Sequence, residues 1–95
     1  MKKLRDGWVE GSVKEFLGLS DVDMEFIETR LALARRLREL RTKKHMTQND
    51  LAARLHTSQS RVVKMEKGDP TVTIDLLIRS LYQLGVKRRE LLKAS

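Results

Sequence analysis

The stretch from residue 47 to residue 68 constrains the fold of this 95-residue chain more than any other. It contains two short runs whose apolar residues recur at helical spacing, and each run follows a hydroxyl side chain that can cap a helix, Thr47 or Ser58. A tight turn separates the two runs. The pattern therefore predicts helices at residues 48–55 and 59–67 that pack against each other. The side chains expected between them are Leu51, Ala52, Leu55, Val62 and Met65.

The composition favours a small helical domain. Hydrophobic residues make up 40% of the chain but aromatic residues only 4%, so the core must consist mainly of aliphatic side chains and Met. Proline occurs once, and no stretch has the alternation of a half-buried strand. The absence of Cys excludes a disulfide scaffold and any zinc site built on Cys. We therefore expect an all-α fold, a five-helix bundle.

A long helix is expected before the two short ones, at residues 21–43. Ser20 precedes it as a cap, and Asp23 lies three residues further on, as in a capping box. Residues 1–28 then form an N-terminal extension that includes the start of this helix, and residues 29–95 form the main helical domain. A stripe with helical period runs along this helix through Ile27, Leu31, Ala34, Leu37 (or Arg38) and Arg41, flanked by Leu33 and Leu40.

Two more helices are expected after the short pair. Gly68 is suited to cap the second short helix, since glycine adopts the left-handed conformation easily. Thr73 then caps a helix that runs to about residue 84, and a short last helix covers residues 87–92. The apolar residues expected on the inner face of the helix after Thr73 are Ile74, Leu77, Ile78, Leu81 and Leu84.

The net charge of +7 is unevenly distributed along the chain. Residues 1–28 carry four basic and seven acidic residues, a net charge of −3. Residues 29–68 carry eleven basic and three acidic residues, a net charge of +8, and residues 69–95 have a net charge of +2. Most of the basic excess thus lies on the segment with the two short helices, where it attracts polyanions such as nucleic acid. A solvated charged surface is the alternative interpretation of such a distribution.

From residue 37 to about residue 92 the chain closely resembles the Cro/repressor-type helix-turn-helix family, also called the XRE family. The resemblance implies a phage-repressor-type bundle that binds double-stranded DNA with the helix at residues 59–67. It implies neither a cofactor nor a metal. The positions that match the family pattern are Thr47, Gln48, Leu51, Ala52, Leu55, Ser58, Gln59, Ser60, Val62, Met65, Glu66, Gly68, Leu84 and Gly85.

The resemblance implies base contacts from the first turns of the second short helix, at Gln59, Ser60 and Lys64, and the neighbouring Arg61 is added by position and charge. A Gln at position 59 can pair with adenine in the major groove, and Arg61 or Lys64 can pair with guanine. For Arg61 and Lys64, a contact to phosphate alone is the alternative.

Other positions are expected to contact the DNA backbone or to support the motif. In the family, a residue placed like Gln48 bonds a phosphate and braces the first Gln of the next helix, here Gln59. Arg41 and Glu66 match a family ion pair whose role is structural. The candidate phosphate contacts are Lys43, Lys44, Thr47, Gln48, Arg54 and Lys67.

The chain departs from the family at His56, where the turn usually carries Gly in a left-handed conformation. His tolerates this conformation better than a branched residue does, so the motif is expected to survive with modest strain. His56 and His45 have no acidic or thiol partner at metal-ligand spacing, so no metal site is expected. No catalytic set of residues is recognisable, and we expect a protein that is not an enzyme.

The resemblance also implies a homodimer on a palindromic site, since one helix contacts few base pairs. The expected function is a transcriptional regulator, most simply a repressor. The alternative is the antitoxin of a toxin–antitoxin pair, with a toxin bound to the N-terminal extension. The candidate dimer contacts, unless they complete the core, are Leu81, Tyr82, Val86, Leu91 and Leu92. The apolar residues of the extension that fold back or bind a partner are Trp8, Val9, Phe16 and Leu17.

No apolar run approaches the roughly 20 residues that a membrane-spanning helix needs. The N-terminal residues also lack the apolar core of a signal peptide. A cytoplasmic protein of a prokaryotic cell or a phage is therefore expected.

Overall fold

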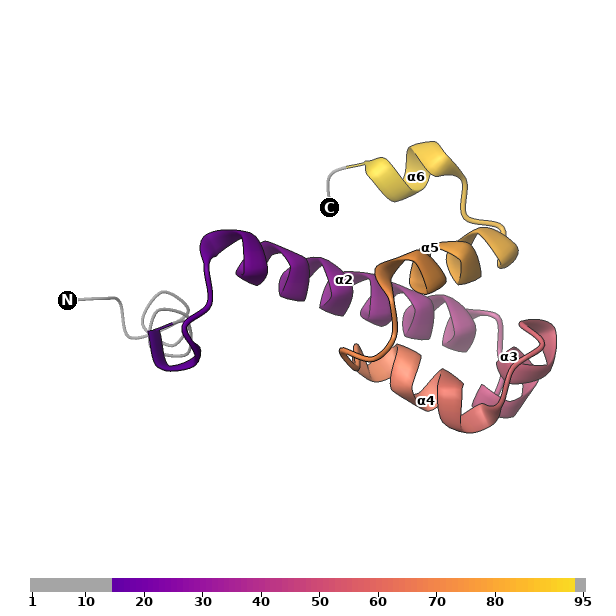
Figure 1. The fold of residues 1–95 in the computed structure, drawn as a ribbon. Coiled ribbons are helices and arrows are strands. Elements are labelled where there is room, and N and C mark those ends of the chain that lie inside the picture. Colours follow the sequence, from indigo (N-terminus) through magenta and orange to yellow (C-terminus); the bar gives the residue numbers. More distant parts are fainter. Residues whose placement is uncertain (1–14, 94–95) are drawn as a thin grey trace.

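The computed structural model describes residues 15–93, and this part of the chain is helical without strands (Figure 1). The all-α prediction is therefore confirmed. Trp8 and Val9 lie outside the described residues. A single helical turn at residues 15–17 precedes the labelled helices. These helices are α2 (Asp21–Lys43), α3 (Gln48–Arg54), α4 (Gln59–Lys67), α5 (Ile74–Gln83) and α6 (Arg88–Leu92).

Helices α2, α3, α4 and α5 begin at the residues expected from the sequence because their caps are local, and α6 begins one residue later than expected. Ser20 Oγ accepts a hydrogen bond from the backbone of Asp23 at 3.1 Å, and the Asp23 carboxylate accepts one from the backbone of Ser20 at 3.2 Å. Thr73 Oγ1 likewise accepts a hydrogen bond from the backbone of Leu76 at 3.1 Å. Each bond satisfies an N–H group that the first helical turn leaves without a partner.

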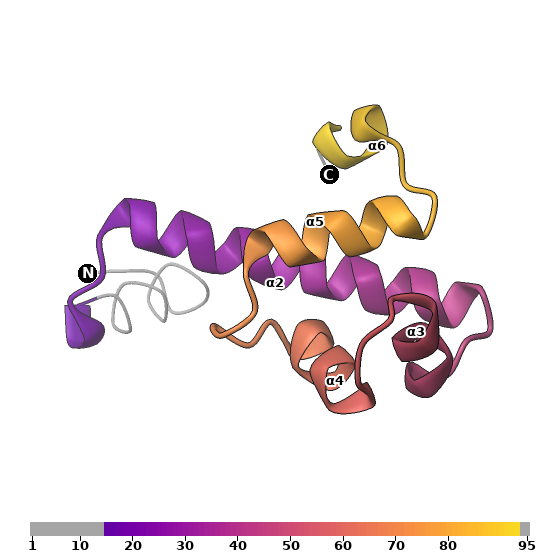
Figure 2. The same ribbon diagram turned by 45° about the vertical axis from the view of Figure 1, so that its right-hand side comes forward.

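The core lies between the C-terminal half of α2 and the helices α4 and α5, which pack on it from different sides (Figures 1 and 2). Helices α3 and α4 also pack closely on each other. Val72, in the connection between α4 and α5, joins the core without having been expected there. The buried core residues are Leu37, Leu51, Ala52, Val62, Met65, Val72, Leu77, Leu81 and Leu84.

The N-terminal half of α2 extends beyond the other helices (Figure 1). No residue of α2 before Ala34 is buried, so only the second half of the predicted stripe reaches the core. Ile27 is half-buried, and Leu31 is 44% exposed. The reason is length: α2 has 23 residues, whereas α4 has 9 and α5 has 10, too few to cover the whole of α2.

Gly68 ends α4 in the left-handed conformation, with φ at 70°. A Cβ atom at this position would lie 2.7 Å from the Leu31 Cδ2 atom, so the glycine also permits close approach of α2. Gly18 has nearly the same φ, 69°, but a Cβ there would meet no atom within 4 Å.

We expect the substitution Gly68→Ala to lower the free energy of unfolding by about 2 kcal/mol, because it combines left-handed strain with a clash against Leu31. The free energy is measured by urea denaturation followed by circular dichroism. Gly18→Ala is the matched control, since it introduces similar backbone strain without the clash, and it should cost less. An equal loss for both variants would show that the contact with Leu31 does not matter.

Candidate nucleic-acid interface

The first short helix of the predicted motif is held by a complete capping box. Thr47 Oγ1 accepts a hydrogen bond from the backbone of Asp50 at 3.0 Å, and the Asp50 carboxylate accepts one from the backbone of Thr47 at 2.9 Å. The backbone N–H of Thr47, followed by its hydroxyl, holds the pKa of Asp50 below its usual range. Asp50 was not singled out from the sequence, although its place three residues after Thr47 fits the box.

The turn between α3 and α4 has the conformation that the sequence predicted. His56 has φ of 57°, in the left-handed region, and the backbone of Thr57 donates to the carbonyl of Ala52 at 2.9 Å. His45, after α2, has a similar φ of 58°, which was not predicted. The motif therefore forms with His where the family usually has Gly.

The N-terminal turn of α4 faces outward. Ser58 Oγ accepts a hydrogen bond from the backbone of Arg61 at 3.2 Å and lies 3.2 Å from the Ser60 hydroxyl. Val62 and Met65, on the opposite face of α4, are completely buried. The four candidate base-contacting residues are all exposed: Gln59, Ser60, Arg61 and Lys64.

A polar groove of about 310 Å³ runs beside this exposed face. It joins the beginning of α4 to the connection between α4 and α5, so the exposed residues of α4 share one surface with that connection. The residues that line the groove are Ser58, Ser60, Arg61, Lys64, Thr71 and Val72.

An ion pair joins α2 to α4. Arg41 Nε donates to Glu66 Oε2 at 2.5 Å, and the second terminal nitrogen of Arg41 donates to Glu66 Oε1 at 3.1 Å. The two side chains are only 12% and 4% exposed. Arg41 also donates to the carbonyl of Met46 at 2.8 Å, so the pair fixes the connection between α2 and α3 as well.

Gln48 joins the same network instead of bracing Gln59. Its side-chain amide donates to Glu66 Oε1 at 3.1 Å. Glu66 therefore accepts hydrogen bonds from α2 and from α3 while belonging to α4. This arrangement fixes the position of α4 relative to the first two helices of the motif.

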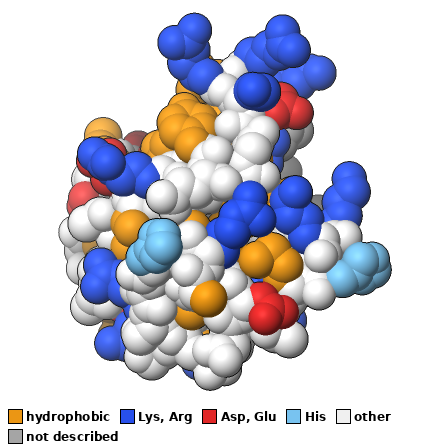
Figure 3. Space-filling view, turned by 90° about the vertical axis from the view of Figure 1, so that its right-hand side faces the viewer, with side chains coloured by type: hydrophobic (Ala, Val, Ile, Leu, Met, Phe, Trp, Pro, Cys, Tyr) orange, Lys and Arg blue, Asp and Glu red, His pale blue; other side chains and the backbone are white. Residues whose placement is uncertain are grey.

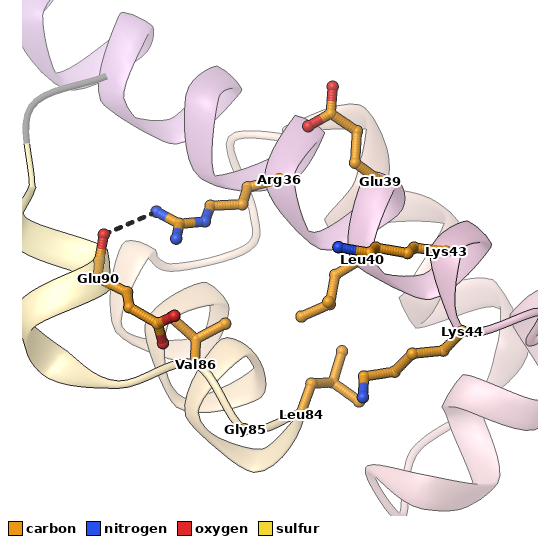
Figure 4. A pocket seen from close by; sticks show the side chains of 9 residues that line it. All are labelled: Arg36, Glu39, Leu40, Lys43, Lys44, Leu84, Gly85, Val86 and Glu90. Carbon is orange, nitrogen blue, oxygen red and sulfur yellow. Dashed lines mark hydrogen bonds between the residues drawn. The ribbon is translucent and has the colours of Figure 1, made fainter.

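The candidate phosphate contacts are spread over the molecule. Arg54 and Lys67 are exposed in the last turns of α3 and α4. Lys43 and Lys44 line a different groove, of about 410 Å³, together with Leu84 and Val86 near the end of α5 (Figure 4). The structure therefore groups Ser58, Ser60, Arg61 and Lys64 around one groove but does not group Lys43 and Lys44 with them.

Basic side chains are visible on the face that carries the end of α2 and α3 (Figure 3). A separate group of Lys and Arg side chains covers the top of this view, where α6 lies. Within residues 15–93, no three His, Asp or Glu side chains gather closely enough to hold a metal ion. None of the helices in this part is long and apolar enough to cross a membrane.

The helix-turn-helix family model matches residues 37–91, which is more than half of the chain. The chain belongs to the Cro/repressor-type helix-turn-helix family. Comparisons with curated proteins and with solved structures found no match. The matched residues include the capped helices α3 and α4, the turn at His56 and the ion pair of Arg41 with Glu66. The protein is thus a DNA-binding regulator, of a family that is not typically enzymatic.

We expect Glu66→Ala to lower the free energy of unfolding by about 3 kcal/mol, because it leaves the guanidinium of Arg41 without its carboxylate in a nearly buried site. The free energy is measured by urea denaturation. The double variant Arg41→Met with Glu66→Met removes both charges and should be more stable than the summed losses of the single variants Arg41→Met and Glu66→Met predict. Strictly additive losses would mean that the two side chains do not depend on each other.

Proposed function

We propose that the protein is a repressor that binds as a dimer to a palindromic operator, with α4 in the major groove. The observation that carries the proposal is the outward N-terminal turn of α4, capped by Ser58 and bearing Gln59, Ser60 and Arg61. N–H groups at a helix start favour the phosphate backbone, while these side chains can hydrogen-bond base edges. Binding would block transcription by occupying the site, without chemistry.

The residues proposed to contact DNA divide into two roles. Gln59, Ser60, Arg61 and Lys64 contact bases, because they lie on the exposed first turns of α4. The residues proposed to contact phosphates are Lys43, Lys44, Thr47, Gln48, Arg54 and Lys67. Phosphate contacts position the protein but do not select a sequence.

The proposed dimer follows from the size of α4. Its nine residues span only about 13 Å, so one copy contacts a few base pairs. Two copies on half-sites about one turn of DNA apart would multiply both affinity and specificity.

The test is the selection of bound duplexes from a random pool. We expect an enriched palindrome whose half-sites are separated by about one helical turn, roughly 34 Å. Recovery of unrelated sequences would contradict sequence-specific binding. Recovery of a single half-site would contradict the dimer on a palindrome but not DNA binding.

The two roles are separated by two substitutions. Gln59→Ala should reduce the preference for the selected site over random duplex by about tenfold, because it removes a base contact worth about 1–3 kcal/mol. Lys67→Ala should weaken binding to both duplexes alike and reduce the dependence on salt, because it removes a phosphate contact. Fluorescence titrations at several salt concentrations measure both effects. Equal changes in preference for the two variants would refute the division.

A second candidate function is that of an antitoxin, which would bind a toxin through the N-terminal extension and repress its own operon. It is supported by Phe16 and Leu17, which are 87% and 58% exposed and lie in an extension with a net charge of −3. The test is co-purification of the full chain with the product of an adjacent open reading frame. Phe16→Asp with Leu17→Asp should abolish co-purification, and unchanged co-purification would remove this candidate surface.

A further inference from the structure

The exposed apolar side chains of the protein fall into two groups. Among residues 15–93, seven large apolar side chains are exposed. Five lie between residues 16 and 31, in a segment that we call the arm (residues 15–31), and the other two, Tyr82 and Leu92, lie near the C-terminus. The five residues of the arm are Phe16, Leu17, Val22, Phe26 and Leu31.

The arm and the C-terminal segment that contains Leu92 have opposite charges. The arm contains five acidic residues and one basic residue, Arg30, a formal net charge of −4. Residues 87–93, which contain α6, carry four basic residues and one acidic residue, a formal net charge of +3. The two surfaces are therefore complementary, because their charges are opposite and both carry exposed apolar side chains.

One face of α2 connects these two segments. Val22, Phe26, Leu33 and Leu40 lie on the same face because they are spaced by three or four residues or by a multiple of the heptad. The C-terminal part of this face is covered, since Leu33 and Leu40 pack against the core. The N-terminal part is bare: Val22 is 64% and Phe26 is 58% exposed.

Helix α6 lies over the covered part of this face. Arg36, on the same face, donates to the carbonyl of Glu90 at 3.2 Å, and Leu40 and Glu90 line one groove (Figure 4). Leu91 packs against the core, but Leu92 remains 75% exposed. Within one chain, α6 therefore covers neither the exposed apolar residues of the arm nor Leu92 at its own end.

The charge of the arm decides between its possible occupants. DNA is a polyanion and would be repelled by five carboxylates. Two arms packed face to face would bring like charges together, which is costly. The C-terminal segment of a second copy is basic and partly apolar, so its charge is attracted to the arm and its apolar side chain can pack against those of the arm.

We propose that the protein dimerises by reciprocal exchange: the arm of each copy packs against the α6 of the other. The inference rests on the proposed dimer and assigns its interface. Such an isologous contact covers the exposed apolar residues of both arms and Leu92 of both copies. It also leaves α4 accessible, because α6 and α4 lie on opposite sides of α2 (Figures 1 and 2).

A charge exchange tests the proposal with the full chain alone. One variant carries Glu25→Lys and Glu28→Lys in the arm, and the other carries Arg88→Glu and Arg89→Glu in α6. Sedimentation equilibrium without DNA should give a dimer for the wild type and a dissociation constant raised about tenfold or more for each variant. An equimolar mixture of the two variants should associate more tightly than either variant alone, because one contact of the mixed dimer pairs an unchanged arm with an unchanged α6 and the other places the introduced lysines opposite the introduced glutamates.

Asp75→Lys and Arg79→Glu, both on the exposed side of α5, are controls for a change of charge elsewhere, and they should leave the dimer unchanged. Circular dichroism verifies that every variant is folded. A monomeric wild type, unaltered association of either charge variant, or a mixture that associates no more tightly than either variant alone would overturn the proposal. The arm would then be left for a different protein.

The outcome is separate from that of the DNA-binding proposal. A dimer that recovers by charge exchange but selects no DNA sequence would support the interface and contradict the repressor. Selective DNA binding by a dimer whose association neither charge variant changes would support the repressor and contradict the proposed interface.

Discussion

The bond between Arg41 and Glu66 is the constraint on which the DNA-binding surface depends. Helix α4 packs on the core mainly through Val62 and Met65. Two buried side chains fix how closely the helix approaches the core, but they leave it freer to rotate about its own axis. Glu66 adds a second line of attachment, because it accepts hydrogen bonds from α2 through Arg41 and from α3 through Gln48. The outward direction of the first turn of α4 is therefore set by this hydrogen-bonded network. Its charged side chains, Arg41 and Glu66, are too deeply buried to replace these hydrogen bonds easily with bonds to water.

The length of α2 has a second consequence for the whole molecule. The helix contributes Leu37 to the core and Arg41 to the network, yet its first half extends past α4 and α5. An uncovered helix of this kind needs either intrinsic helix stability or an additional contact, because a helix gains most of its stability from packing. The capping box of Ser20 and Asp23 supplies part of the intrinsic helix stability, and the exposed apolar residues of the arm provide a surface for an additional contact.

The sequence predicted what depends on near neighbours. Caps at Ser20, Thr47, Ser58 and Thr73 involve residues three positions apart. Helical spacing also predicted the buried Val62, Met65, Leu77 and Leu81, whereas Ile74 and Ile78, expected on the same inner face, are only half-buried. The bond of Gln48 to Glu66, the groove beside Lys43 and Lys44 and the bare start of α2 were not predicted. Each depends on how far one helix reaches past another, and no local pattern contains that information. The candidate contacts to DNA remain predictions for the same reason, since they also require the position of a second molecule.

The distribution of charge gives these separate features a common physical basis. The acidic residues of the arm lie at one end of α2, and the ion pair that supports α4 lies near the other. A helix spans about 1.5 Å per residue, so Glu25 and Arg41 are about 24 Å apart, which is more than two screening lengths at physiological salt. The carboxylates near Glu25 therefore act only weakly on the end of α2 that holds Arg41, although the basic segment at residues 29–68 begins at Arg30, beside the arm. A shorter α2 would bring the acidic residues of the arm closer to Arg41 and Glu66, so the length that leaves the arm uncovered also keeps most of its negative charge away from the ion pair that supports α4.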